Sequence, residues 1–184
     1  MEKNYDKTRE HLLVAGIQEI EKHGLSEFSL RRVAAACGVS CAAPYKHFKN
    51  KDEFVLEIIR YIGNRWKMLE AQVLRIFEND PQRQITELCM AYIKFWIANP
   101  NFRSILLMNP RQMDEAQKGA KADIDKTMIE LIRAFFATDA EKRLYEIRSL
   151  VFGALLMLEN GEMQNDEQSL GLIKTAIEER LKQR

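Results

Sequence analysis

The sequence has few of the residues that interrupt helices, with 8 Gly and 4 Pro among 184 residues. Alternating β-branched runs, which would indicate strands, are also scarce. These shortages exclude a sheet-rich protein and predict an all-α fold. No apolar run approaches the roughly 18 residues of a membrane span, and the N-terminus lacks the apolar core of a signal peptide. We therefore expect a cytoplasmic protein with no membrane partner.

Residue patterns for catalysis or metal binding are also missing. His11 and His23 have no partner at metal-ligand spacing, and there is no Ser/His/acid set and no glycine-rich phosphate loop. The cysteines, Cys37, Cys41 and Cys89, are odd in number and widely spaced after the first two, which fits reduced thiols. The sequence thus predicts a protein that is not an enzyme and holds no metal or cofactor.

Asp and Glu are absent from residues 29–51, which read SLRRVAAACGVSCAAPYKHFKNK. This stretch carries five Lys or Arg residues and His47, although the whole chain has a net charge of only +1. The first 51 residues have a net charge of +3 and the remainder −2, so the basic charge is concentrated near the N-terminus. A local basic patch of this kind is typical of nucleic-acid binding.

The same stretch predicts two short helices joined by a tight turn. Ser29 is a good N-cap for the first helix, and Gly38 permits the sharp reversal after it. Ser40 is the expected N-cap of the second helix, in which Pro44 has no N–H for the bond back to Ser40. Asn50 is expected to cap the helix that follows. A basic helix-turn-helix predicts binding to DNA.

The second short helix is expected to begin with small side chains, which let a helix seat deeply in the major groove, where base edges are legible. Nearby side chains can reach phosphates, and free N–H groups at helix starts attract anions. The candidate DNA-binding residues are Ser29, Arg31, Arg32, Ser40, Cys41, Ala42, Ala43, Tyr45, Lys46, His47 and Lys51. Cys41 has a second interpretation as a redox-sensitive thiol, because a helix N-terminus can lower a thiol pKa.

Residues 9–55 resemble the DNA-binding domain of the TetR family of bacterial transcriptional repressors. The matching positions are Arg9, Leu12, Ala15, Ile20, Gly24, Leu30, Val33, Ala34, Gly38, Val39, Ser40, Tyr45, His47, Phe48, Lys51 and Phe54. The segment APYKHF is similar to a subgroup with Ala-Pro before the tyrosine, whereas leucine is more usual at position 44. The resemblance implies base contacts around positions 40, 42 and 43, and backbone contacts from positions 29, 45, 47 and 51. It also implies a homodimer built through the last two helices and a ligand cavity in the C-terminal half.

Further helices are predicted beyond residue 51, with breaks at the Asn-Asp-Pro and Asn-Pro sequences near residues 80, 100 and 110. The expected helices cover about 7–23, 51–78, 81–98, 100–108, 113–137, 140–160 and 165–182. We assign residues 1–51 to a three-helix DNA-binding domain and 52–184 to a C-terminal helical domain for ligand binding and dimerisation.

The last two helices carry apolar stripes whose residues step by three and four, which suits helix-against-helix packing. With the resemblance, they give a candidate dimer interface of Leu144, Ile147, Val151, Ala154, Leu158, Leu170, Ile173, Ile177 and Leu181. Met and aromatic side chains also gather in this half, and such side chains can shape an adaptable apolar pocket. An ordinary helical core would explain each of them as well. The candidate pocket residues are Met90, Phe95, Trp96, Met108, Phe135 and Phe152.

These features together predict a ligand-responsive homodimeric repressor that binds a palindromic operator in double-stranded DNA. Its effector is expected to be a small, largely apolar molecule. An activator, or a regulator controlled by a protein partner, would fit the same residues. A further alternative is a helical ligand-binding protein or enzyme with an incidental basic face, which would show no salt-sensitive DNA binding.

Overall fold

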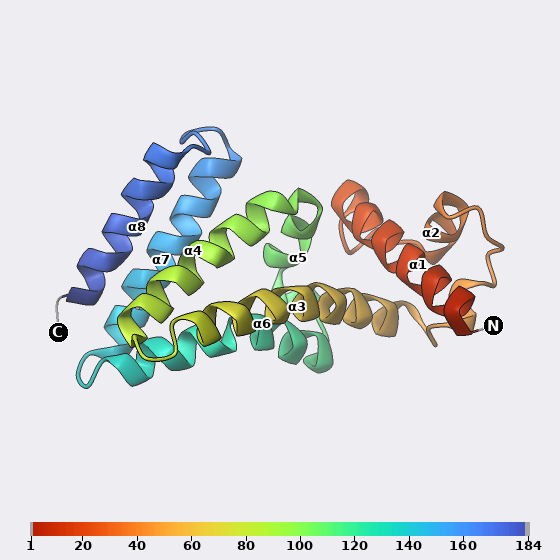
Figure 1. The fold of residues 1–184 in the computed structure, drawn as a ribbon. Coiled ribbons are helices and arrows are strands. Elements are labelled where there is room, and N and C mark those ends of the chain that lie inside the picture. Colours follow the sequence, from red (N-terminus) through yellow and green to blue (C-terminus); the bar gives the residue numbers. More distant parts are fainter. Residues whose placement is uncertain (1, 183–184) are drawn as a thin grey trace. The chain divides into compact units, whose positions relative to one another are not determined.

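The computed structural model describes residues 2–182, with side chains described from residue 7 onward except at residue 106. Over this range the chain is helical and contains no strand, which confirms the predicted all-α fold. Figure 1 follows the helices along the chain. The α-helices are α1 (Glu2–His23), α2 (Leu30–Ala36), α3 (Lys51–Ile76), α4 (Pro81–Ala98), α5 (Arg103–Leu106), α6 (Glu115–Phe135), α7 (Ala140–Glu159) and α8 (Glu167–Lys182). The 3₁₀ segments are η1 (Pro44–Lys46), η2 (Pro100–Phe102) and η3 (Pro110–Gln112).

The chain divides into two compact units. The first comprises the chain up to Arg65 together with Pro100–Asp123, and the second comprises Trp66–Asn99 together with the chain from Ile124 onward. Helices α3 and α6 each pass from one unit to the other within their own length. These units are defined by contacts within the structure, whereas the boundary at residue 51 separates two predicted functions. That boundary stays a prediction. Among the described helices, none has the length and apolar character that a bilayer span requires.

The first unit packs α1 against α2 and against the first turns of α3. Leu12 and Val33 are fully buried there, as is Phe54 of α3. A Cβ added to Gly16 would lie 2.4 Å from the Phe54 ring, so the glycine allows α1 and α3 to approach closely. The core of the N-terminal region therefore includes residues beyond position 51.

The second unit is built from α4, α7 and α8 together with parts of α3 and α6, and α7 and α8 run side by side (Figure 1). Trp66 of α3 lies edge-on to Tyr92 of α4, with ring centroids 5.2 Å apart. The indole Nε1 of Trp66 donates a hydrogen bond of 3.0 Å to the carbonyl of Ile124, so the polar group of this buried ring is satisfied.

Most predicted helix boundaries are confirmed. The Asp80 carboxylate accepts a bond of 3.0 Å from the Arg83 amide, and Pro81 is the first residue of α4, as its position after a capping residue favours. The predicted helix at 100–108 is instead divided into η2 and α5, and α6 begins two residues later than expected. The cap of α8 is Asp166 and not Asn165, because the Asp166 carboxylate accepts from the Ser169 amide at 2.8 Å.

The apolar stripes of α7 and α8 are buried within a single chain, and their assignment to a dimer interface stays a prediction. Eight of the nine predicted side chains are at most 8% exposed, and Leu170 alone among them is half-buried. They pack within the second unit, where α4, α7 and α8 contact one another. The spacing of these residues correctly indicates helix packing, but the partner helices belong to the same chain.

Candidate DNA-binding surface

Helix α2 is capped at both ends by the residues that its sequence suggests. The Ser29 side chain accepts from the Arg32 amide at 3.5 Å, and its extended backbone starts the helix. After the helix, Gly38 has φ = +66°, a left-handed conformation that most side chains disfavour. The Val39 amide then bonds to the carbonyl of Ala34 at 3.0 Å and closes the turn. These contacts fix the direction of the chain as it enters the predicted recognition segment.

The recognition segment is not an α-helix, which corrects the prediction for residues after Ser40. Residues 41–43 form a turn and Pro44–Lys46 form the 3₁₀ segment η1. The Ala43 amide bonds to Ser40 at 2.9 Å, an i to i−3 bond, while Pro44 has no N–H with which to make the helical bond back to Ser40. Proline at this position therefore produces a tighter winding than an α-helix.

The segment exposes one set of side chains and buries another. We call Ser40, Cys41, Ala42, Tyr45 and Lys46, all exposed to solvent, the exposed ridge. Tyr45 is 59% exposed, so its hydroxyl is available to a partner. Ala43 and His47 are half-buried, and Pro44 and Phe48 are buried beneath them. Five of the predicted DNA-binding residues thus share one surface.

Phe48 anchors this surface to the core. Its ring lies edge-on to Phe54 at a centroid distance of 4.3 Å, and the Arg9 guanidinium lies over the Phe48 ring, 5.3 Å from its centre. Arg9 also forms an ion pair with Glu57 of α3. The sequence analysis gave Arg9 and Glu57 no role, because two residues 48 positions apart give no local signal of their pairing.

Arg31 and Arg32 are placed in different environments. The Arg32 side chain bonds to the buried Glu19 carboxylate of α1 at 2.7 Å and to the Glu27 carbonyl at 2.5 Å. The hydrogen bond with Glu19 raises the pKa of Arg32 further. Arg31 is exposed. Arg32 therefore holds α1 to α2, while Arg31 stays a candidate for phosphate contact.

Lys51 also has partners inside the protein. Its Nζ donates to the Leu25 carbonyl at 3.0 Å, and it lies 5.8 Å from the centre of the Phe28 ring. At the helix start beside it, the Asn50 side chain accepts from the Glu53 amide at 2.8 Å, which confirms the predicted cap. Lys51 therefore adds positive charge at the edge of the surface, but one of its N–H donors is already bonded to the Leu25 carbonyl.

His47 lies where burial and positive charge act on it together. Desolvation, with the nearby charges of Arg9 and Lys46, lowers the pKa of the His47 imidazole below its usual 6.5. The ring is therefore mainly neutral at pH 7, and it would meet a phosphate as a hydrogen-bonding group and not as a cation.

The two cysteines of the region differ in exposure. Cys41 is exposed on the ridge, whereas Cys37 is half-buried and its Sγ donates to the His11 carbonyl at 3.5 Å. Burial raises the pKa of the Cys37 thiol, which makes it less reactive. The described residues contain no group of three or more side chains arranged to hold a metal ion.

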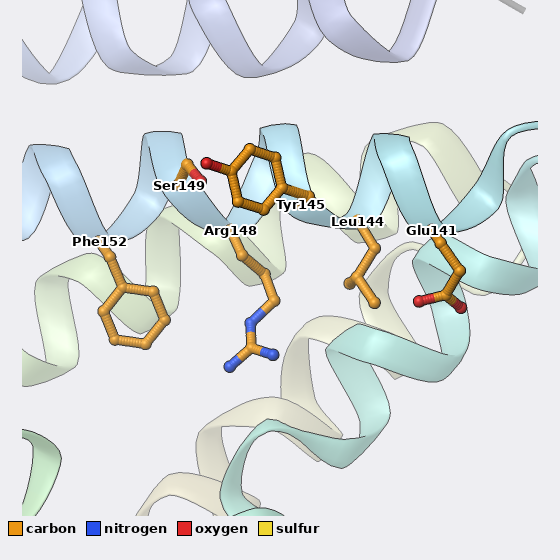
Figure 2. A pocket seen from close by; sticks show the side chains of 6 residues that line it. All are labelled: Glu141, Leu144, Tyr145, Arg148, Ser149 and Phe152. Carbon is orange, nitrogen blue, oxygen red and sulfur yellow. The ribbon is translucent and has the colours of Figure 1, made fainter. Parts of the chain in front are cut away.

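The predicted pocket residues are distributed over both units. Met108 belongs to the first unit and the other five to the second. Met90, Phe95 and Trp96 are buried in α4, and Phe135 is half-buried at the end of α6. Phe152 of α7 lines a cavity of about 400 Å³, together with Glu141, Leu144, Tyr145, Arg148 and Ser149 (Figure 2). The sequence analysis named Leu144 and Phe152 among these lining residues but did not place them together.

A basic, acid-free turn between two capped helices, with small side chains exposed on it, defines a helix-turn-helix DNA-binding protein. Residues 12–58 match the family described as bacterial regulatory proteins, tetR family. This match covers the N-terminal region of the chain and agrees with the resemblance that its residues carry.

Similarity to individual proteins is more distant. A probable acrEF/envCD operon repressor of Escherichia coli strain K12 is 26% identical over 100 residues, 54% of this chain and 46% of the relative. The chain thus matches about half the length of such relatives. A TetR family transcription regulator from Marinobacter aquaeolei VT8 has a TM-score of 0.75 at 15% identity, covering 98% of each chain. FadR from Bacillus subtilis, in complex with stearoyl-CoA, has a TM-score of 0.71 at 11% identity, covering 93% of this chain and 96% of that one. At these identities the shared property is the fold.

Proposed function

We propose that the protein is a transcriptional repressor that binds an operator in double-stranded DNA through the exposed ridge. The observation that carries the proposal is the combination of small and basic side chains on a segment that Phe48 and Pro44 fix from beneath. Small side chains at positions 40–42 let the turn approach base edges, while Tyr45 and Lys46 reach the phosphates. The description of the Escherichia coli relative as an operon repressor supports repression over activation.

Lys46 gives the sharpest test of the phosphate contact. Replacing it in Lys46→Ala should weaken binding to every duplex and reduce the slope of log affinity against log salt by about 0.9 for each Lys46–phosphate contact that is lost. Lys142→Ala is the matched control, because Lys142 is an exposed lysine on α7, outside the proposed surface. Fluorescence anisotropy on a duplex that carries an inverted repeat from upstream of the coding region measures both. An unchanged slope in Lys46→Ala would contradict the phosphate contact.

We further propose that the active form is a homodimer whose ridges enter successive major grooves, about 34–36 Å apart if the half-sites are one turn apart. Because the predicted interface stripes are buried, the interface is assigned to outward apolar side chains of α7 and α8. Leu156, Met157 and Leu172 are 44%, 39% and 61% exposed. Exposed apolar side chains on adjacent helices are typical of an interface between copies.

The dimer proposal predicts a change in mass when a charge is placed on this face. Leu172→Glu should shift the protein from dimer to monomer in light scattering, because a carboxylate would be desolvated in the interface. Met68→Glu is the control, because Met68 is 69% exposed on α3 and lies outside the face. A wild-type protein that is monomeric at micromolar concentration would disprove the proposal.

Regulation by a small molecule is the remaining part of the proposal. The cavity beside Phe152 is large enough for a small organic ligand, since ligand pockets begin near 300 Å³.

A reporter gene under the upstream region distinguishes repression from activation. Its output should rise when the protein is deleted, and a fall would instead identify an activator.

A further inference from the structure

The cavity on α7 combines an apolar wall with one oriented guanidinium. Figure 2 shows Phe152, Arg148 and Leu144 extending to the same side of α7, with Tyr145 lying across the front of the helix. Leu144 is 7% exposed and Tyr145 is 75% exposed, so the hollow has a buried base and an open aromatic rim. The cavity therefore offers apolar surface to most of a ligand and a concentrated charge to one end of it.

The Arg148 guanidinium is held in place from beneath. Its Nη2 lies 3.0 Å from Oδ2 of Asp125 in α6, and its carbon atom lies 5.7 Å from the centre of the Phe152 ring. The hydroxyl of the buried Tyr92 donates to the other oxygen, Oδ1 of Asp125, at 2.9 Å. Asp125 thus accepts from Nη2 of the guanidinium, and the five N–H donors of an arginine leave others for a ligand.

The acidic group at the other end of the cavity is already paired. Arg133 donates two bonds to the Glu141 carboxylate, at 2.6 and 3.2 Å. Because the carboxylate is shared with a cation in this way, its repulsion of a bound anion is reduced. Each charge at the cavity thus has an opposite partner, and Arg148 is the one that presents N–H donors to a ligand.

We propose that this cavity binds a small organic anion, an aromatic or branched apolar body with one terminal carboxylate. The carboxylate would take the outer N–H groups of Arg148, and the apolar body would lie against Leu144, Tyr145 and Phe152. A carboxylate can accept two parallel N–H bonds from a guanidinium. The proposal rests on the regulatory role proposed above for this cavity, and all the lining residues belong to the second unit.

Isothermal titration calorimetry tests which ligand charge the site prefers. The full chain is titrated with three biphenyl ligands of similar shape and different charge. Biphenyl-4-carboxylate is expected to bind about tenfold more tightly than biphenyl-4-carboxamide, and more tightly still than the cationic biphenyl-4-methylamine. Equal binding of the carboxamide, tighter binding of the amine, or no heat from millimolar carboxylate would overturn the proposal. None of these measurements needs DNA, so failure here and failure of the repressor proposal are distinguishable.

Two variants test whether the ligand binds in this cavity. Arg148→Gln should lose at least tenfold in affinity for the carboxylate and lose its preference over the carboxamide, with Arg75→Gln, an exposed arginine of α3, as control. If Arg148→Gln does not fold, Tyr145→Ala replaces it, because that side chain is exposed and its loss should cost several-fold in affinity against Met68→Ala as control. Unchanged affinity in the folded variants would overturn the proposal. A lower molecular mass for Tyr145→Ala would also overturn it, since a second copy would then cover the cavity.

Discussion

At the scale of the residue, an exposed position and a positive charge do not by themselves identify a DNA contact. Arg31 and Arg32 are adjacent and carry the same charge, yet Arg32 is bonded to Glu19 and to the carbonyl of Glu27. Lys51 is likewise bonded to Leu25. The partners of these cations come from α1 and the turn after it, so they depend on the folded arrangement of the first unit.

This difference predicts different outcomes for two neighbouring substitutions. Arg32→Gln should lower the free energy of unfolding, because Glu19, which is 8% exposed, loses its bonds from Arg32. Arg31→Gln should stay within about 0.5 kcal/mol of wild type and weaken DNA binding. Urea unfolding followed by circular dichroism measures the first effect, and anisotropy the second. Equal stabilities for the two variants would show that the Glu19 contact contributes nothing.

The sequence predicts which segment carries the candidate DNA-binding residues, but not which of them are bonded inside the protein. The absence of acid between residues 29 and 51 indicated DNA binding, and Ser29, Gly38 and Asn50 have the turn and cap roles expected of them. The contacts of Arg9 with Glu57 and Phe48 join positions far apart in the chain, and no periodicity predicts them. A cavity in the C-terminal half is predicted, with Phe152 among its candidates, but the place of Arg148 in it is not, because Asp125 and Tyr92 orient Arg148 from two other helices.

At the scale of the element, the backbone conformation of single residues decides where helices end. Gly38 adopts φ = +66° between α2 and the exposed ridge, while Gly119 lies inside α6 with no atom within 4 Å of an added Cβ. The same substitution should therefore have opposite effects at the two positions.

Gly38→Ala should destabilise the protein by about 1–2 kcal/mol, because a left-handed conformation is costly for alanine. Gly119→Ala should stabilise it by roughly 0.5–1 kcal/mol, because alanine loses less conformational entropy in a helix. Thermal unfolding of both variants provides the comparison. A Gly38→Ala protein as stable as wild type would mean that the turn can rearrange without its left-handed residue.

Element type was the part of the recognition segment that the sequence analysis missed. Pro44 was recognised as unable to bond back to Ser40, and a short irregular helix was still expected there. The turn at 41–43 followed by η1 shows that losing this one bond is enough to favour i to i−3 bonding over an α-helix. The local sequence predicts where this segment begins and ends. Its 3₁₀ conformation also depends on the burial of Pro44 and Phe48.

At the scale of the whole molecule, the DNA-binding region relies on chain beyond its functional boundary. Phe54 and Ile58 pack against Gly16, and the Gln117 side chain of α6 donates to the Asp52 carbonyl at 3.1 Å. A fragment of residues 1–51 lacks all of these partners. It should show little helical circular dichroism and no cooperative melting, whereas the full chain should show both. A folded fragment with a sharp transition would establish residues 1–51 as an independent domain.

The passage of α3 through both compact units limits how this gene can change in length. Each residue advances an α-helix by about 100°, so one inserted codon near residue 68 would rotate the part of α3 that follows relative to Trp66. Glu70 would then leave the buried face that it shares with Trp66, and its bond from the Thr127 hydroxyl would be lost. Related sequences should therefore vary in length within the turn at 160–166 and hold constant spacing along α3, which an alignment of homologues would reveal as an uneven distribution of gaps.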